Sequence, residues 1–130
     1  GEGNGGIIVP DLHYGRDALI GIALFLSHLA KSEKTCSNLR AVYPAYFMSK
    51  KKMDLNANLS LSTIFEALKK EFAAYPMNDV DGLKIDFENE WVHLRASNTE
   101  PIMRIYTEAK TQAAADALAD KIIQLIHKIQ

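Results

Sequence analysis

Two arginines flank a short polar segment that reads RASNTEPIMR over residues 95–104. The segment contains a serine, an asparagine and a threonine, all of which have short hydrogen-bonding side chains. Proteins bind a phosphate group with several converging short donors and with a guanidinium that can contact two oxygens. The residues alone leave two interpretations open, and one of them is a phosphate-binding loop. The alternative is a polar hairpin turn in which Ser97, Asn98 and Thr99 bond only to their own backbone.

A second segment that could bind a ligand opens the chain and reads GEGNGG. Glycines allow unusual backbone angles and let a ligand approach the main chain closely. The carboxylate of Glu2 and the amide of Asn4 are suited to hydrogen bonds with sugar hydroxyls. On its own, such a segment is more often a disordered terminus.

Residues 95–104 resemble the phosphate-binding loop of the α-phosphohexomutases, which include phosphoglucomutases, phosphomannomutases, phosphoglucosamine mutases and acetylglucosamine phosphomutases. The superfamily pattern is Arg-x-Ser-Asn/Gly-Thr-x-Pro, and the sequence matches it at every position. The resemblance implies that this loop holds the phosphate of the substrate that is not being transferred. The residues implied are Arg95, Ser97, Asn98 and Thr99, with Arg104 in a supporting position.

The glycine-rich segment resembles the sugar-binding loop of the third domain of the same superfamily, Gly-Glu-x-Ser-Gly-His. Glu2 matches the glutamate that contacts the ring hydroxyls. Asn4 stands where serine is usual, and Gly6 stands where histidine is usual. The resemblance thus implies sugar contacts from Glu2 and Asn4. Because the two segments occur in superfamily order, it covers essentially the whole chain.

The elements around residues 95–104 are predicted to form a small α+β domain. Residues 83–87 alternate between apolar and polar side chains, which is typical of a half-buried strand. The full order is a strand at 45–48, a helix from Ser60 to about Phe72, strands at 83–87, 91–96 and 102–109, and a helix capped by Thr111. This order predicts a small antiparallel sheet with both helices on one face. The lysines at 50–52 are expected to lie in a solvated turn.

The first part of the chain is predicted to contain a loop, a short strand at 7–9 and a helix at 16–31. The helix is apolar around nearly its whole circumference, so it requires burial on several sides. We therefore interpret residues 1–38, including a polar linker at 32–38, as the remnant of a preceding α/β domain. Residues 39–130 would form the fourth, phosphate-binding domain. Without its partners, helix 16–31 is expected to drive self-association.

Composition excludes several functional classes. The formal net charge of −1 argues against nucleic acid as a partner. The longest apolar run, residues 19–26, is too short to cross a membrane. Cys36 is the single cysteine, so no internal disulfide can form, which favours a reducing, cytoplasmic location. Asp79 and Asp81 are expected to belong to a turn rather than to a metal site.

The superfamily resemblance also implies a mechanism for the parent enzyme. A phosphoserine in the first domain donates its phosphoryl group to a phosphosugar with the help of Mg²⁺ held in the second domain. Neither the phosphoserine motif nor the aspartate-rich magnesium loop occurs in this sequence. We therefore expect no catalytic residue, no metal site and no mutase activity within these residues.

Three questions stay open from the sequence. The short spacing between Thr99 and Arg104 favours a phosphoglucosamine mutase, with a phosphomannomutase or phosphoglucomutase as the alternative. His13 lies near the glycine-rich segment and could contact a substrate. A different class of function is a free-standing anion-binding or protein-interaction module that is not part of an enzyme.

Overall fold

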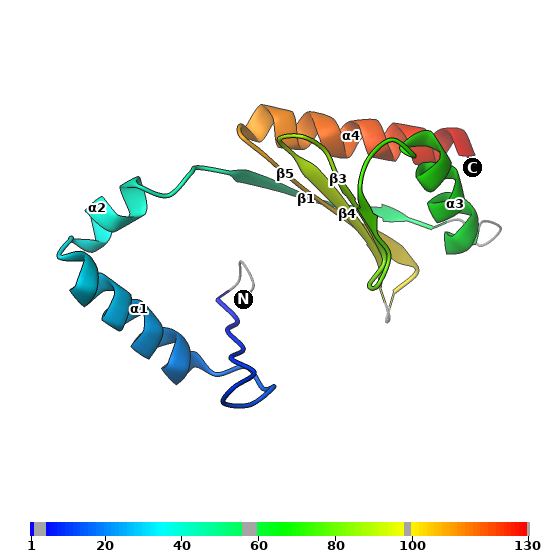
Figure 1. Ribbon diagram of the computed structural model, residues 1–130. Coiled ribbons are helices and arrows are strands. Elements are labelled where there is room, and N and C mark those ends of the chain that lie inside the picture. Colours follow the sequence, from blue (N-terminus) through cyan, green and yellow to red (C-terminus); the bar gives the residue numbers. More distant parts are fainter. Residues whose placement is uncertain (2–4, 56–59, 98–99, 130) are drawn as a thin grey trace. The chain divides into compact units, whose positions relative to one another are not determined.

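The computed structural model describes residues 1, 5–55, 60–97 and 100–129, which belong to two compact units, Gly1–Pro44 and Ala45–Gln130 (Figure 1). Unit 1 contains the helices α1 (Ala18–Ser32) and α2 (Cys36–Ala41). Unit 2 contains a five-stranded sheet and the helices α3 (Leu61–Glu71) and α4 (Gln112–Ile129).

The sheet of unit 2 is antiparallel throughout and has the strand order β1-β5-β4-β3-β2. Its strands are β1 (Phe47–Asp54), β2 (Met77–Asn78), β3 (Leu83–Asp86), β4 (Trp91–Ala96) and β5 (Ile102–Ala109). The predicted fold class, a small antiparallel sheet with two helices on one face, is confirmed. The two-residue strand β2 was not predicted.

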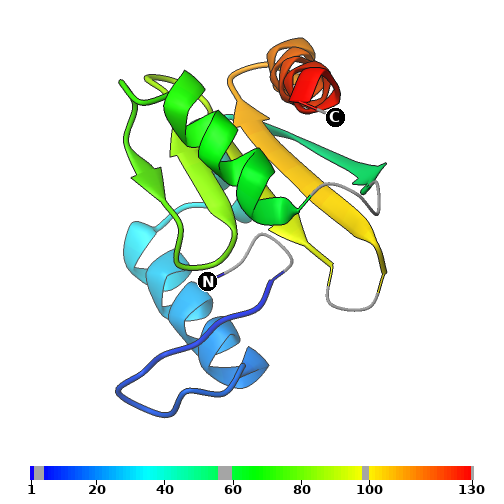
Figure 2. The same ribbon diagram turned by 90° about the vertical axis from the view of Figure 1, so that its right-hand side faces the viewer.

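One hydrophobic core joins the helices to a single face of the sheet. Leu94 of β4 and Ile105 of β5 are fully buried in it together with Ile64 of α3 and Ile122 of α4. Figure 2 shows α3 and α4 on the same side of the strands. Because side chains alternate along a strand, the neighbours of these buried residues face away from the helices. This second face is called the open face below.

The helices of unit 2 begin where the sequence predicts. The Ser60 hydroxyl accepts a hydrogen bond from the Thr63 amide at 3.2 Å, and the Thr111 hydroxyl accepts one from the Ala114 amide at 3.1 Å. Such caps satisfy amides that have no partner within the helix.

Three local predictions are wrong. The lysines at 50–52 lie within strand β1, paired with β5, and not in a turn. Residues 36–41 form helix α2, capped by the Thr35 hydroxyl, and this helix includes the last residues of the linker predicted at 32–38. Residues 7–9 form no strand: Val9 makes an isolated bridge, and its carbonyl accepts from the amides of Leu12 and His13 because the chain turns at once.

Helix α1 has no buried residue within its unit, although it is rich in large apolar side chains. The exposed fraction of Leu19 is 78%, and that of Phe25 is 47%. None of the helices in the described parts of the chain is long and apolar enough to cross a membrane.

Candidate functional site

Strands β4 and β5 place the two predicted arginines directly opposite each other. Arg95 and Arg104 are cross-strand partners, and both are exposed on the open face. The hairpin loop between them begins at Ser97, whose amide donates to the Ile102 carbonyl at 2.9 Å. Within the loop, the Ile102 amide donates to the Glu100 carbonyl at 2.8 Å. The structure therefore brings Arg95, Ser97 and Arg104 to one end of the sheet.

The other predicted site residues lie outside the described part of the chain. These are Asn98 and Thr99 in the hairpin loop, and Glu2 and Asn4 in the glycine-rich segment.

Arg95 is oriented by a carboxylate that the sequence did not reveal as part of the site. Its Nη2 lies 3.1 Å from Oδ2 of Asp81, in the turn between β2 and β3, and both side chains are at least half exposed. His93 lies two residues before Arg95 on β4, and its Nε2 is 2.6 Å from the carbonyl oxygen of Asp81. A guanidinium has five N–H donors, so the pair with Asp81 leaves donors for an anion. Asp81 thus positions Arg95 and offsets part of its charge.

The turn that carries Asp81 lies tightly against β4 because of a glycine. Gly82 has a φ of +77°, a backbone angle that favours glycine. A Cβ atom added at this position would lie 2.1 Å from the carbonyl oxygen of Leu94. This close approach brings Asp81 within reach of Arg95.

Asp79 in the same turn has a different partner. Its carboxylate accepts a hydrogen bond of 2.9 Å from Nζ of Lys69 on α3. This hydrogen bond, followed by the charge of Lys69, lowers the pKa of Asp79 from its usual value. Asp79 and Asp81 are therefore engaged by two different cations.

A row of positive charge crosses three strands beside the hairpin loop. Lys52 of β1 is the cross-strand partner of Arg104, which is the partner of Arg95. Lys50 lies two residues from Lys52 on β1 and is the cross-strand partner of Tyr106. Its Nζ lies 5.7 Å from the centre of the tyrosine ring. Sequence reasoning missed both lysines, although their spacing of two places them on one face of a strand.

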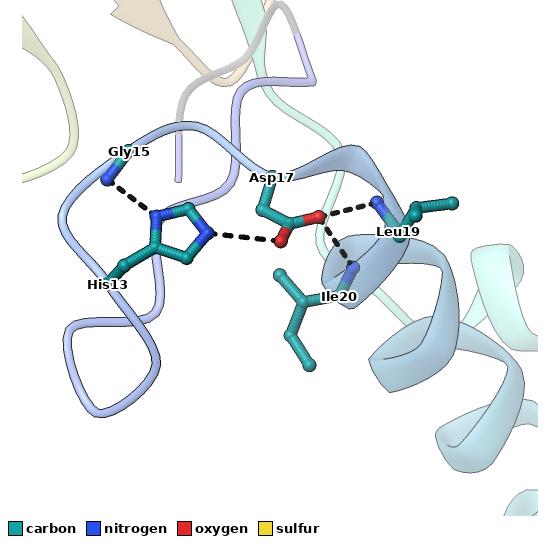
Figure 3. Close-up of polar contacts among 5 residues, drawn as sticks. All are labelled: His13, Gly15, Asp17, Leu19 and Ile20. Carbon is teal, nitrogen blue, oxygen red and sulfur yellow. Dashed lines mark hydrogen bonds and ion pairs between the residues drawn. The ribbon is translucent and has the colours of Figure 1, made fainter.

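In unit 1, His13 is engaged locally at the start of α1. Figure 3 shows its two ring nitrogens in separate hydrogen bonds: the Gly15 amide donates to Nδ1 at 2.9 Å, and Nε2 lies 3.1 Å from Oδ2 of Asp17. Since Nδ1 accepts, the neutral ring carries its hydrogen on Nε2 and donates it to Asp17. Both nitrogens are thus occupied in this conformation.

Asp17 caps helix α1 through its other carboxylate oxygen. Its Oδ1 accepts from the amides of Leu19 and Ile20 at 2.8 and 3.1 Å (Figure 3). The hydrogen bond from the Ile20 amide, followed by that from His13, lowers the pKa of Asp17 from its usual value. The segment before α1 also packs closely on it, since a Cβ at Gly21 would lie 3.0 Å from Cγ1 of Ile7.

Two family models match the chain. The model "Phosphoglucomutase/phosphomannomutase, C-terminal domain" matches residues 51–125, and the model for alpha/beta/alpha domain III of the same family matches residues 1–46. The first match includes β4, the hairpin loop and β5.

Similar curated proteins carry related names. A phosphoglucomutase/phosphomannomutase from Thermococcus kodakarensis is 37% identical over 98% of this chain and 28% of its own length. A phosphoglucosamine/phosphogalactosamine mutase from Sulfurisphaera tokodaii is 32% identical over 96% of this chain and 28% of its own length. The chain thus spans less than a third of these relatives.

Solved structures share the fold. A phosphoglucomutase/phosphomannomutase family protein from Burkholderia thailandensis aligns with a TM-score of 0.70 and 23% identity, over 99% of this chain and 28% of that one. N-acetylphosphoglucosamine mutase from Aspergillus fumigatus, in complex with GlcNAc-6P and magnesium, aligns with a TM-score of 0.56 and 19% identity, over 88% of this chain and 21% of that one. The C-terminal-domain model matches more than half of the chain, residues 51–125, and this match shows that the chain belongs to the phosphoglucomutase/phosphomannomutase family.

Proposed function

We propose that this chain supplies the substrate-phosphate-binding part of a phosphohexomutase, an enzyme that interconverts sugar 1-phosphates and 6-phosphates. The observation that carries the proposal is the pair Arg95 and Arg104, which lie opposite each other on the open face where the hairpin loop begins. Guanidinium groups bind a phosphate dianion through charge-assisted hydrogen bonds, and loop amides and hydroxyls can complete its coordination.

In this proposal the chain holds one phosphate while chemistry occurs at the other end of the sugar. Positioning and charge neutralisation carry most of the catalysis in phosphoryl transfer. The guanidinium of Arg95 would bind the phosphate, and Asp81 would hold that guanidinium in position. The remaining hydrogen-bond donors to the phosphate would come from Ser97, Asn98 and Thr99. Glu2 and Asn4 would contact the sugar.

Magnesium is the cofactor that the superfamily resemblance implies for the parent enzyme. Among the described residues, no three His, Cys, Asp or Glu side chains come together as metal ligands. The resemblance implies that its ligands, like the phosphoserine, come from other parts of the enzyme. The 130-residue chain alone should not turn over glucose 1-phosphate. A cytoplasmic location, consistent with a single cysteine, is part of the proposal.

The test is binding of glucosamine 6-phosphate to the ¹⁵N-labelled chain, followed by NMR. We expect shifts at the amides of residues 95–104, and we expect Arg95→Gln to weaken binding about tenfold or more, since hydrogen bonds to charged groups contribute about 1.5–3 kcal/mol. Arg40→Gln, an exposed arginine of α2 in the other unit, is the matched control and should leave the affinity unchanged.

An equal loss with both variants, or no shift in residues 95–104, would contradict the phosphate site. The same titration with mannose 6-phosphate and glucose 6-phosphate tests the sugar, for which we favour glucosamine. If inorganic phosphate bound with the same affinity as all three sugar phosphates, the result would favour a free-standing anion-binding module over part of a phosphohexomutase.

A further inference from the structure

Strand β1 divides its three consecutive lysines between the two faces of the sheet. Lys50 and Lys52 pair with Tyr106 and Arg104, whose side chains alternate with buried core residues, so both lysines lie on the open face. Lys51 pairs with buried Ile105 on the helix side, and its Nζ lies 2.6 Å from Oδ1 of Asp120 on α4.

Three cations of the open face, Lys50, Lys52 and Arg104, have no carboxylate partner among the residues that the structure describes. Lys52, Arg104 and Arg95 are direct cross-strand neighbours, an arrangement that destabilises a sheet when the charges are alike. Arg95 is paired with Asp81, whereas no carboxylate in the described parts of the chain forms an ion pair with Lys50, Lys52 or Arg104. An anion bound between Lys50, Lys52 and Arg104 would relieve the repulsion among these three cations.

The same three cations line a groove of about 360 Å³. This volume lies in the range of small-molecule sites. The remaining lining comes from Lys51, Glu100, Ile102 and Tyr106. Arg95 and Ser97 are not part of the lining, so the groove lies on the β1 side of Arg104, away from the start of the hairpin loop. Glu100 is the one carboxylate among these lining residues, and it would repel an anion.

We propose that this groove is a second anion-binding site, formed by Lys50, Lys52 and Arg104, for a small ligand that carries a phosphate or another oxyanion group with at least two negative charges. It is distinct from the proposed substrate-phosphate loop and shares only Arg104 with it. The aromatic ring of Tyr106 and the side chain of Ile102 provide an apolar surface on which the rest of such a ligand would lie.

Edge protection is the competing explanation for the lysines. β1 is an edge strand, and lysines on edge strands prevent pairing with other chains. That role requires no anion site and predicts that the loss of Lys50 and Lys52 changes only aggregation.

The experiment is a pyrophosphate titration of the ¹⁵N-labelled 130-residue chain, with sodium chloride added to keep the ionic strength constant. The expected result is saturable shifts of amides in 50–54 and 102–106. The double variant Lys50→Gln/Lys52→Gln should raise the dissociation constant about tenfold, because it removes two charges within contact distance of the ligand. Lys70→Gln, the same change at an exposed lysine of α3 that does not line the groove, should change it less than twofold.

Glu100→Gln adds a test with the opposite sign, which a misfolded variant could not imitate: removing its repulsion should tighten binding two- to threefold. Shifts confined to Ser97 and its neighbours would overturn the groove while supporting the proposed substrate loop. Equal weakening by Lys70→Gln and by the double variant would show only a general charge effect and would also overturn it. Increased aggregation without any change in binding would establish edge protection instead.

Discussion

Replacing Gly82 by alanine should destabilise unit 2 by about 3 kcal/mol. Two effects add. A residue with a Cβ in the left-handed region costs about 1–2 kcal/mol, and the φ of Gly82 is +77°. The new Cβ would also lie 2.1 Å from the carbonyl oxygen of Leu94, where ordinary contact requires about 3.3 Å. The turn would have to move away from Leu94 until the Cβ and the carbonyl oxygen reach an ordinary distance. Such a shift is comparable to the overpacking of a core, which costs about 1–3 kcal/mol.

Urea unfolding, followed by the fluorescence of Trp91 on β4, measures this effect in the right unit. Gly82→Asn separates the two causes, because asparagine tolerates the left-handed region but still carries a Cβ. We expect both variants to lose similar stability, since the contact with Leu94 dominates. Asp81→Ala, in the same turn, should cost less than about 1 kcal/mol, as is usual for an exposed ion pair. A loss below about 1 kcal/mol for Gly82→Ala would refute the reasoning.

Three further predictions concern the core, the pH dependence and the first unit. Ile122→Ala should cost about 2–5 kcal/mol in urea unfolding, because the side chain is fully buried, whereas Gln124→Ala on the exposed side of the same helix should cost little. The pKa of Asp116 is lowered from 3.8, first by a hydrogen bond from the Ser49 hydroxyl. Its contribution to stability is therefore present above about pH 4 and is lost as the pH falls through the lowered pKa, so Asp116→Asn should reduce the acid sensitivity of the urea midpoint. We also propose that the chain self-associates through α1; Phe25→Asp should lower the mass measured by light scattering at high concentration, and a monomer mass for the unmodified chain would contradict this.

Strands β3 and β4 could be predicted because apolar and polar residues alternate along them in the sequence. Residues 83–86 and 91–96 alternate between buried and less buried side chains, and this alternation gives a period of two. Strand β1 has the same geometry, but its lysines occupy both faces, one of them held by Asp120 on a helix far along the chain. A polar run of this kind looks the same in a strand and in a turn until its partners are known.

Both arginines of the site were predicted, but the carboxylate that pairs with Arg95 was not. Asp81 reaches Arg95 only because β2 and β3 fold the turn back onto β4, and β2 is just two residues long. Likewise, α2 has six residues, of which only half are polar, and its start depends on a cap from Thr35. Short elements carry too few residues for a period to be recognised, so they escape prediction from sequence patterns.

The strand order has a consequence for how the arginines meet a ligand. β4 and β5 are both interior strands, each hydrogen-bonded on two sides. Amide hydrogens there, such as those of Leu94 and Ile105, should be among the slowest in the unit to exchange with deuterated solvent. The backbone that carries Arg95 and Arg104 should therefore rarely unfold locally. An anion that binds there needs to restrict only the side-chain rotations of the two arginines.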